Sequence, residues 1–194
     1  MAVDQAGNIY VSGESPGEST KSDYATIRYD SDGTQAWVAR YDGPANPDDT
    51  AIEMAIDYER NIYVTGWSAV LGVHQEYVTL KYTQDGSQAW VANYPGGPPS
   101  AMTMDDVGNI FVTGMDGRGS YATVKYDQQG SEVWDAFYSG SSMESLFCSY
   151  KATALAVDSA GNLYVTGESR ACFNNYVTIK YNSDGSEAWL NHYD

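Results

Sequence analysis

One six-residue segment is written four times in this chain of 194 residues. It reads N-I-Y-V-S-G at Asn8–Gly13 and returns with one or two changes at Asn61–Gly66, Asn109–Gly114 and Asn162–Gly167. A repeat of about 48 residues indicates one supersecondary unit that is used four times. Each residue can therefore be compared with its three counterparts, and this comparison separates the common framework from residues that differ between repeats.

Each repeat contains four runs that are typical of β-strands, called A, B, C and D below. They are clearest in the fourth repeat, at Ala152–Val157, Leu163–Gly167, Tyr176–Tyr181 and Glu187–Tyr193. The 17 Tyr and 19 Gly of the chain suit short strands joined by tight turns. Strand B has apolar or aromatic residues on both faces, as expected of a strand that is covered on both sides.

Both hairpin turns of the repeat have clear signatures. The A–B turn reads D-x-x-G-N, as at Asp4–Asn8, and uses Asp, Gly and Asn to satisfy a tight turn. In the second repeat Arg60 replaces the glycine, so we expect a somewhat different turn there. The C–D turn, D-S-D-G-T at Asp30–Thr34, is a hairpin signal. A four-residue loop would pair Tyr29 with Thr34.

The same register would set the basic residue of strand C against an amide or a carboxylate of strand D. The expected pairs are Arg28 with Gln35, Lys81 with Gln88, Lys125 with Glu132 and Lys180 with Glu187. We interpret these as framework pairs rather than as a basic stripe for ligands. Strand D carries a tryptophan in every repeat, which predicts packing between neighbouring sheets rather than a sugar platform. These tryptophans are Trp37, Trp90, Trp134 and Trp189.

A four-stranded meander packed between similar meanders is a β-propeller blade. The pattern D-x-x-G-N-[IL]-[YF]-V-[ST]-G, followed by Y-x-T-[IVL]-[KR]-Y-x-x-D-G-[ST]-x-x-W, resembles the SBBP family of β-propeller repeats. All four repeats match, apart from departures at Arg60, Gln129 and Asp135. The resemblance implies a multi-bladed, secreted or surface protein, mostly bacterial or archaeal, whose ligand is undefined.

We therefore predict one all-β domain, a β-propeller of four four-stranded antiparallel blades. The blades are expected at about 1–43, 44–96, 97–140 and 141–194. They form either a closed four-bladed ring or half of an eight-bladed ring made by two chains. In the second case the open terminal blades would join copies into a homo-oligomer.

Charge and hydropathy exclude some classes of partner. The formal net charge is −16, from 10 Lys plus Arg against 26 Asp plus Glu, which disfavours nucleic acid as a partner. No run of about 18 apolar residues predicts a membrane span. No secretory signal is visible at the start, and Met1–Val3 is shorter than the lead-in Ala152–Val157. We expect a trimmed fragment of a longer extracellular or cell-surface protein, with a naturally short N-terminus as the alternative.

The B–C loops and the links between repeats vary, so we expect any binding site there. Eight candidate binding residues lie in or near these segments: Glu14, Trp67, His74, Asp116, Arg118, Tyr150, Lys151 and Arg170. A partly exposed Trp67 near carboxylates could stack on a sugar ring, whereas the plainer alternative is that Trp67 caps the end of a blade. His192, at the strand D position of Arg40, is interpreted as framework.

Catalysis has weaker support in the sequence. No common nucleophile, metalloprotease or phosphate-loop motif is present, and we identify no catalytic set. Asp30–Gly33 resembles part of a calcium loop but is better explained as a turn. We expect neither a metal nor another cofactor. Cys148 and Cys172 are predicted at the same end of the fourth blade, either as a disulfide or as two free thiols.

The sequence favours a non-enzymatic extracellular scaffold that binds a protein or a glycan on its variable loops. A lectin-like propeller is the alternative. A polysaccharide-active enzyme that uses loop carboxylates is less favoured.

Overall fold

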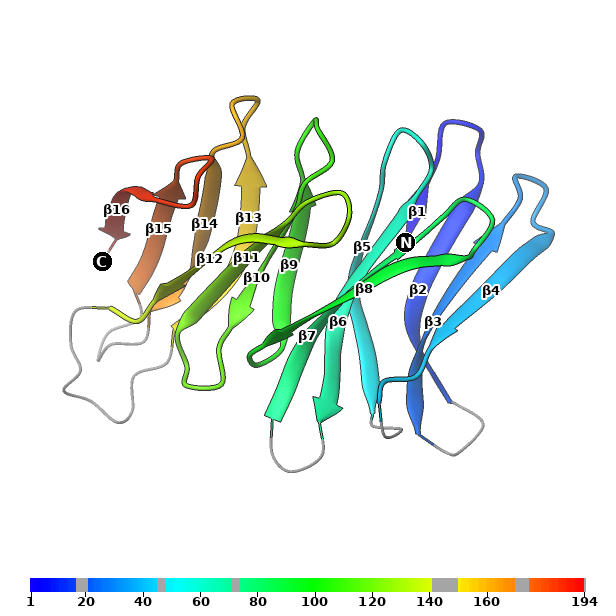
Figure 1. The fold of residues 1–194 in the computed structure, drawn as a ribbon, viewed down its shortest axis with the longest axis horizontal. Helices are drawn as coiled ribbons and strands as arrows, with labels where there is room; N and C mark the ends of the chain where they lie inside the picture. The colour runs from blue at the N-terminus through cyan, green and yellow to red at the C-terminus, as the bar shows by residue number, and fades with distance from the viewer. Residues whose placement is uncertain (17–20, 45–47, 71–73, 141–149, 170–174, 194) are drawn as a thin grey trace. The chain divides into compact units, whose positions relative to one another are not determined.

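The computed structural model describes residues 1–16, 21–44, 48–70, 74–140, 150–169 and 175–193. Over these ranges the chain forms four antiparallel four-stranded sheets (Figure 1). Each sheet is one contiguous meander whose strands follow one another in chain order. The chain divides into two compact units, Met1–Pro95 and Gly96–Asp194, with two sheets in each. Within the described ranges no helix is long and apolar enough to cross a membrane.

The first unit holds the first and second sheets. The first sheet consists of β1 (Ala2–Val3), β2 (Ile9–Pro16), β3 (Ser22–Tyr29) and β4 (Gln35–Tyr41). The second sheet consists of β5 (Asp49–Ile56), β6 (Ile62–Val70), β7 (His74–Tyr82) and β8 (Gln88–Pro95).

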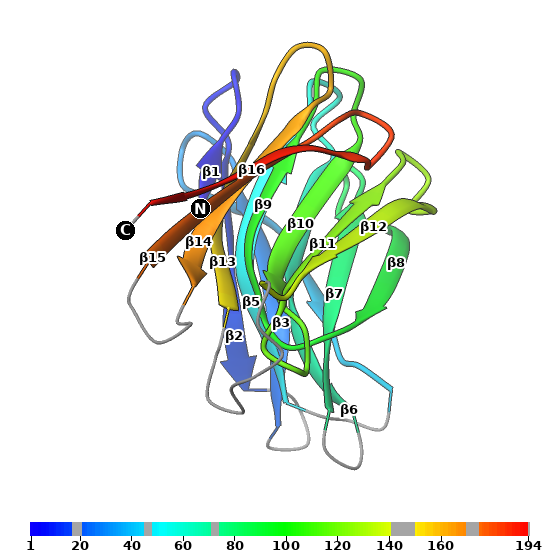
Figure 2. The same cartoon turned by 90° about the vertical axis from the view of Figure 1, so that its left-hand side faces the viewer.

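The second unit holds the third and fourth sheets. The third sheet consists of β9 (Pro99–Met104), β10 (Ile110–Met115), β11 (Tyr121–Tyr126) and β12 (Glu132–Tyr138). The fourth sheet, whose edge strand β16 faces the viewer in Figure 2, consists of β13 (Tyr150–Val157), β14 (Leu163–Ser169), β15 (Asn175–Tyr181) and β16 (Glu187–Tyr193). The expected strands A to D are thus present. In the fourth repeat A and B extend two residues further at the loop end, because the ladder continues through Tyr150 paired with Ser169.

The A–B turns are built by the aspartate that begins each of them. Asp4 Oδ1 accepts the backbone N–H groups of Ala6 and Asn8, and its Oδ2 accepts the side-chain amide of Asn8. Arg60 does not produce a different turn, contrary to expectation. Its φ of 64° is left-handed, and its N–H donates to the Asp57 carbonyl at 3.0 Å, as the glycine does in the other repeats. A non-glycine residue can occupy this region at a modest energetic cost.

The predicted register of the C–D hairpins is wrong by one residue next to the turn and by two residues beyond it. Asp30 N–H does donate to the Thr34 carbonyl at 2.8 Å, but the ladder begins with Tyr29 opposite Gln35. A bulge follows, so Arg28 lies opposite Trp37 instead of Gln35. One extra residue on the bulged strand shifts every later pair.

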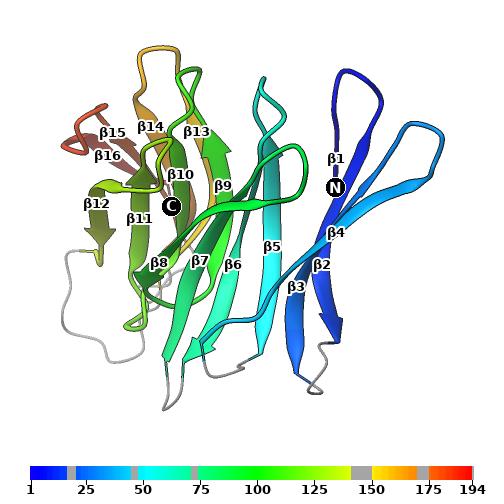
Figure 3. The same ribbon diagram turned by 45° about the vertical axis from the view of Figure 1, so that its right-hand side comes forward.

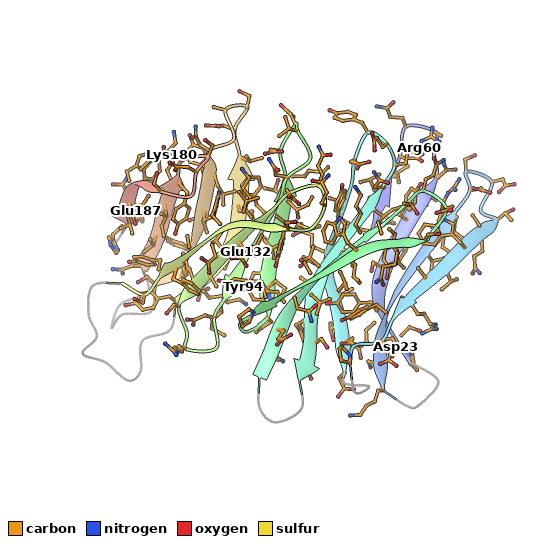
Figure 4. All side chains as sticks on the ribbon, viewed as in Figure 1. Asp23, Arg60, Tyr94, Glu132, Lys180 and Glu187 are labelled. Carbon is orange, nitrogen blue, oxygen red and sulfur yellow. The ribbon has the colours of Figure 1, made fainter. Side chains whose placement is uncertain are left out.

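The lysines of the other three sheets show the same shift. They lie opposite a tryptophan rather than a polar residue: Lys81 opposite Trp90, Lys125 opposite Trp134 and Lys180 opposite Trp189. Glu132, Lys180 and Glu187 are labelled in Figure 4. Each lysine ammonium lies 5.0–5.2 Å from the centre of an aromatic ring on strand B, a cation–π geometry. These basic residues therefore belong to the framework, although not through the partners that we expected.

Within each unit one sheet presents an aromatic face to its neighbour. We call it the tyrosine face; in the first sheet it carries Tyr10, Tyr24, Trp37 and Tyr41. It packs on what we call the glycine face of the second sheet, which carries Ile62, Val64, Gly66 and Gly86. Trp37 lies over Gly86 and donates its indole N–H to the Gln84 carbonyl at 3.0 Å. Trp37 therefore packs between sheets, as the sequence predicts, whereas Trp189 of the fourth sheet is 39% exposed and departs from that prediction.

The second unit repeats this contact. The tyrosine face of the third sheet, with Phe111, Tyr121 and Trp134, packs on the glycine face of the fourth. Trp134 lies over Gly185 and donates to the Ser183 carbonyl at 3.1 Å. The core of each unit therefore lies between its two sheets.

Candidate functional site

In each unit the A–B and C–D turns gather at one end of the strands, the turn end. The strand ends that lead into the B–C connections and into the links between sheets lie at the other end, the loop end (Figure 3). In the first unit Arg60 marks the turn end and Asp23 marks the loop end (Figure 4). The turn end is made from the same bonds in every sheet, so it offers little that is specific to one repeat. Groups that differ between sheets are found at the loop end.

One position at the loop end holds three different residue types in the four sheets. It follows the last glycine of the repeated segment and always pairs with a tyrosine of strand C. Its occupants are Glu14 opposite Tyr24, Trp67 opposite Tyr77, Met115 opposite Tyr121 and Glu168 opposite Tyr176. Two of the predicted binding residues, Glu14 and Trp67, are thus register equivalents. The sequence repeat already aligns them, and the structure adds that each lies beside a tyrosine of strand C.

A second variable position is the first residue of strand A. In the first unit it is Asp49, which pairs with Ser68 and is fully buried. Its Oδ2 accepts the Gly43 backbone N–H at 2.7 Å, whereas Oδ1 has no hydrogen-bond partner among the described residues. Burial raises the pKa of Asp49, and the nearby acids Asp42 and Asp23 raise it further, against hydrogen bonds from Ser68 and Gly43.

Other ionisable groups surround Asp49. Burial and the charge of Asp49 raise the pKa of Tyr24 far above its ordinary value, and raise that of Tyr41 to about 12. Asp23 is almost fully buried, with its Oδ2 3.8 Å from an Arg40 nitrogen. The loop end of the first unit thus holds a carboxyl whose pKa is raised by burial. Perturbed acids of this kind are typical of functional sites, although they also occur in structural networks.

In the second unit the counterpart of Asp49 is Tyr150. Its buried ring meets the Tyr138 ring edge-on at 5.6 Å and lies against Gly140. Its backbone N–H donates to the Gly119 carbonyl at 2.7 Å. Tyr150 therefore packs in the core rather than facing solvent, whereas the adjacent Lys151 is exposed.

The remaining predicted residues are placed as follows. Asp116 Oδ1 accepts the backbone N–H groups of Arg118 and Ser120 at 2.8 and 2.7 Å, so this carboxylate shapes a turn. The side chain of Arg118 is exposed. His74 begins β7, but its side chain, like Arg170 and the pair Cys148 and Cys172, lies outside the described residues. His192 is a ring neighbour of Tyr138 at 6.4 Å, which agrees with its framework interpretation.

Described residues of the first unit line the two hollows that follow, and no predicted binding residue lines either of them. A shallow groove of about 580 Å³ lies at the turn end, lined by Arg28, Thr83, Gln84, Asp85 and Ser87. A smaller one of about 180 Å³ is lined by Met1, Ser12, Ala51, Ile52, Glu53 and Met54. In the described ranges no group of three or more His, Cys, Asp or Glu side chains is arranged to hold a metal ion.

Sequence reasoning did not single out Asp49. The available signal was the difference between D-D-T before strand A in the second repeat and S-Y-K in the fourth. That difference becomes meaningful only when the register aligns Asp49 with Tyr150.

The comparisons with known proteins concern the fold. No protein-family model matches the chain, and no curated protein is similar to it. A solved structure from Lactobacillus plantarum matches with a TM-score of 0.60 at 16% identity, over 98% of this chain and 55% of that one. A periplasmic gluconolactonase from Pseudomonas aeruginosa matches with a TM-score of 0.62 at 13% identity, over 96% and 54%. The fold is therefore all-β and propeller-like, and the chain spans little more than half the length of these neighbours.

Proposed function

We propose that this protein is a non-enzymatic interaction module that acts outside the cytoplasm and binds its partner at the loop end. One observation carries the proposal: a framework repeated four times presents three different types of side chain at one register position, held by Glu14, Trp67, Met115 and Glu168. Rigid scaffolds that vary only in their connecting segments are typical of binding proteins. The periplasmic origin of one structural neighbour supports the location, and the SBBP resemblance supports a surface role.

A lectin-like activity is the second candidate, and Trp67 favours it. Trp67 is the one tryptophan outside strand D, it is only partly buried, and it lies on the strand next to Tyr77. An accessible indole supplies a flat apolar surface for the face of a sugar ring. The acids of the loop end, such as Glu14, would accept hydrogen bonds from sugar hydroxyls.

The decisive experiment combines a binding measurement with a turnover measurement. The whole chain is tested on a glycan array, and for hydrolysis of polysaccharides and of glucono-lactone, the substrate class suggested by the name of the neighbour. The scaffold proposal predicts no turnover above the uncatalysed rate. Product release that is lost in Asp49→Asn would overturn it in favour of an enzyme.

Partner binding is then mapped with a photo-cross-linking residue at position 67. The matched control carries it at position 58, because Tyr58 is an exposed aromatic residue of the A–B turn in the same sheet. The proposal predicts a protein adduct from position 67 and none from position 58. Glycan binding that is abolished by Trp67→Ala but kept by Tyr58→Ala would identify a lectin instead, and equal cross-linking from both positions would contradict a loop-end site.

A further inference from the structure

Two sheet faces of the described chain resemble the faces that pair inside each unit, yet they are exposed. One is the tyrosine face of the fourth sheet. Tyr176 and Tyr193 are 60% and 74% exposed there, whereas their counterparts Tyr24 and Tyr41 are 0% and 8% exposed in the first sheet. Trp189 on the same face is also exposed. Large aromatic side chains gathered on one exposed face mark an interaction surface.

The other exposed face is the glycine face of the first sheet. A Cβ atom added at Gly13 or Gly33 would meet no atom within 4 Å. At the equivalent Gly66 the same atom would overlap the Tyr24 hydroxyl, and at Gly86 it would overlap the Trp37 ring. The space that these glycines provide is therefore filled in the second sheet and empty in the first. The apolar Val3 beside it is also exposed.

The contacts inside the two units show how such faces fit together. In each unit a tyrosine hydroxyl lies over a strand B glycine, and a tryptophan ring lies over a turn glycine. The indole N–H and a strand C cation both point to one turn carbonyl: Trp37 and Arg28 to Gln84, and Trp134 and Lys125 to Ser183. The residues equivalent to these contacts are divided between the two exposed faces. Tyr176, Lys180 and Trp189 form one half, and Gly13, Ser31 and Gly33 form the other.

We propose that a second copy of this chain covers both faces. The tyrosine face of the fourth sheet in each copy lies on the glycine face of the first sheet in the other, so the dimer is closed and reciprocal. Tyr176 would lie over Gly13 and Trp189 over Gly33, with the Ser31 carbonyl accepting the Trp189 indole N–H. The lengths of the structural neighbours favour two copies, because this chain matches 55% and 54% of them.

One residue difference between the first and fourth sheets should weaken this contact. The position held by Ala39 in the tyrosine face of the first sheet is Asn191 in the fourth. A polar amide must be desolvated when the face is covered, so the contact between copies is weaker than the contact within a unit. A net charge of −16 on each copy also opposes association, and added salt should therefore strengthen it.

Sedimentation velocity of the whole chain over a range of concentrations tests the proposal. The wild type should be dimeric. Trp189→Glu blocks one face and Gly13→Leu fills the other, and each should weaken association by at least about tenfold. Gly13 has open space around it and no positive φ, so Gly13→Leu should fold normally. Tyr58→Glu, which adds the same charge to an exposed aromatic position away from both faces, should leave the dimer intact.

A mixture of the two blocked variants gives a second, independent result. Trp189→Glu keeps an intact glycine face and Gly13→Leu keeps an intact tyrosine face. The mixture should therefore associate through one intact contact, and more strongly than either variant does alone. A wild-type monomer would overturn the proposal. Acrylamide quenching of the Trp189 fluorescence would then show whether the tyrosine face is open to solvent or is covered within the same copy. Growth beyond two copies would overturn the closed dimer. None of these outcomes depends on what the loop end binds.

Discussion

The two units bury the same pair of faces, yet they differ at the edge of that contact. In both, a tyrosine hydroxyl and a tryptophan ring of one sheet lie over two glycines of the next. At the loop end, however, the first unit places the Asp49 carboxyl beside Gly43, whereas the second places the Tyr150 ring beside Gly140. One framework thus accepts either a buried acid or a buried aromatic ring at an equivalent position. The shared contacts should govern stability, and this one position should govern how the units differ.

Substitutions at the glycines of the shared contact should cause the largest loss of stability. A methyl group at Gly66 would overlap the Thr50 carbonyl and the Tyr24 hydroxyl, and one at Gly167 would overlap the Lys151 carbonyl. We expect Gly66→Ala and Gly167→Ala each to cost at least about 3 kcal/mol of unfolding free energy, because the obstacle is backbone. Chemical denaturation measures the loss. Gly13→Ala, which meets no atom, is the control, and a comparable loss in that variant would contradict the explanation.

The second-largest loss of stability should differ between the two units. Tyr150→Ala removes a buried ring that packs on Tyr138, so we expect a loss of about 3 kcal/mol. Asp49→Ala removes a carboxyl that accepts one backbone N–H, so we expect only about 1 kcal/mol. Hydrogen exchange read by mass spectrometry should show the loss in β13 and β14 for the first variant and in β5 and β6 for the second. Equal losses would mean that the two positions are energetically alike.

A pH titration sharpens the same difference. Because the folded pKa of Asp49 is raised, its contribution to stability is complete below the ordinary Asp pKa and is lost as the pH rises through the folded value. Asp49→Asn has no such proton to lose. The hydrogen-exchange protection of β5 in this variant should equal that of the wild type at acidic pH and exceed it at neutral pH. If the variant is less protected at neutral pH, the ionised carboxylate stabilises the unit and this interpretation fails.

The smallest effect should be common to both units, and its pH dependence should be opposite to that of Asp49. Burial tends to raise the pKa of Asp4, but hydrogen bonds from Asn8, Ala6 and Tyr10 outweigh it and lower the pKa. Hydrogen bonds from Asn162 lower the pKa of Asp158 in the same way. Their stabilising effect is therefore present above the ordinary Asp pKa and fades as the pH falls through the lowered values. After correction for the slower intrinsic exchange in acid, the protection factors of the turns that begin with Asp4 and Asp158 should fall as the pH is lowered, and Asp4→Asn should remove that response in the first sheet alone.

The strands and their turns could be predicted because each depends on a short, local signal. D-x-x-G-N fixes the A–B turn through the Asp4 carboxylate, and the apolar residues on both faces of strand B indicate a strand that is covered on both sides. The C–D register could not be predicted, because the bulge that sets Arg28 opposite Trp37 places an indole over the turn of the neighbouring sheet. The Asp49 position was missed for a similar reason. Its burial depends on Gly43 and Ser68, which only the folded sheets bring near it.

The contiguous meander also sets the order in which surfaces are covered during synthesis. The first sheet is complete once Tyr41 has emerged, but Tyr24 and Trp37 gain their cover only from the second sheet. At roughly 5–20 residues per second, a ribosome needs about 2–10 s to add a further repeat. For that interval a finished sheet displays an aromatic surface in the cell. Chaperone demand in this protein should therefore rise and fall once within each unit.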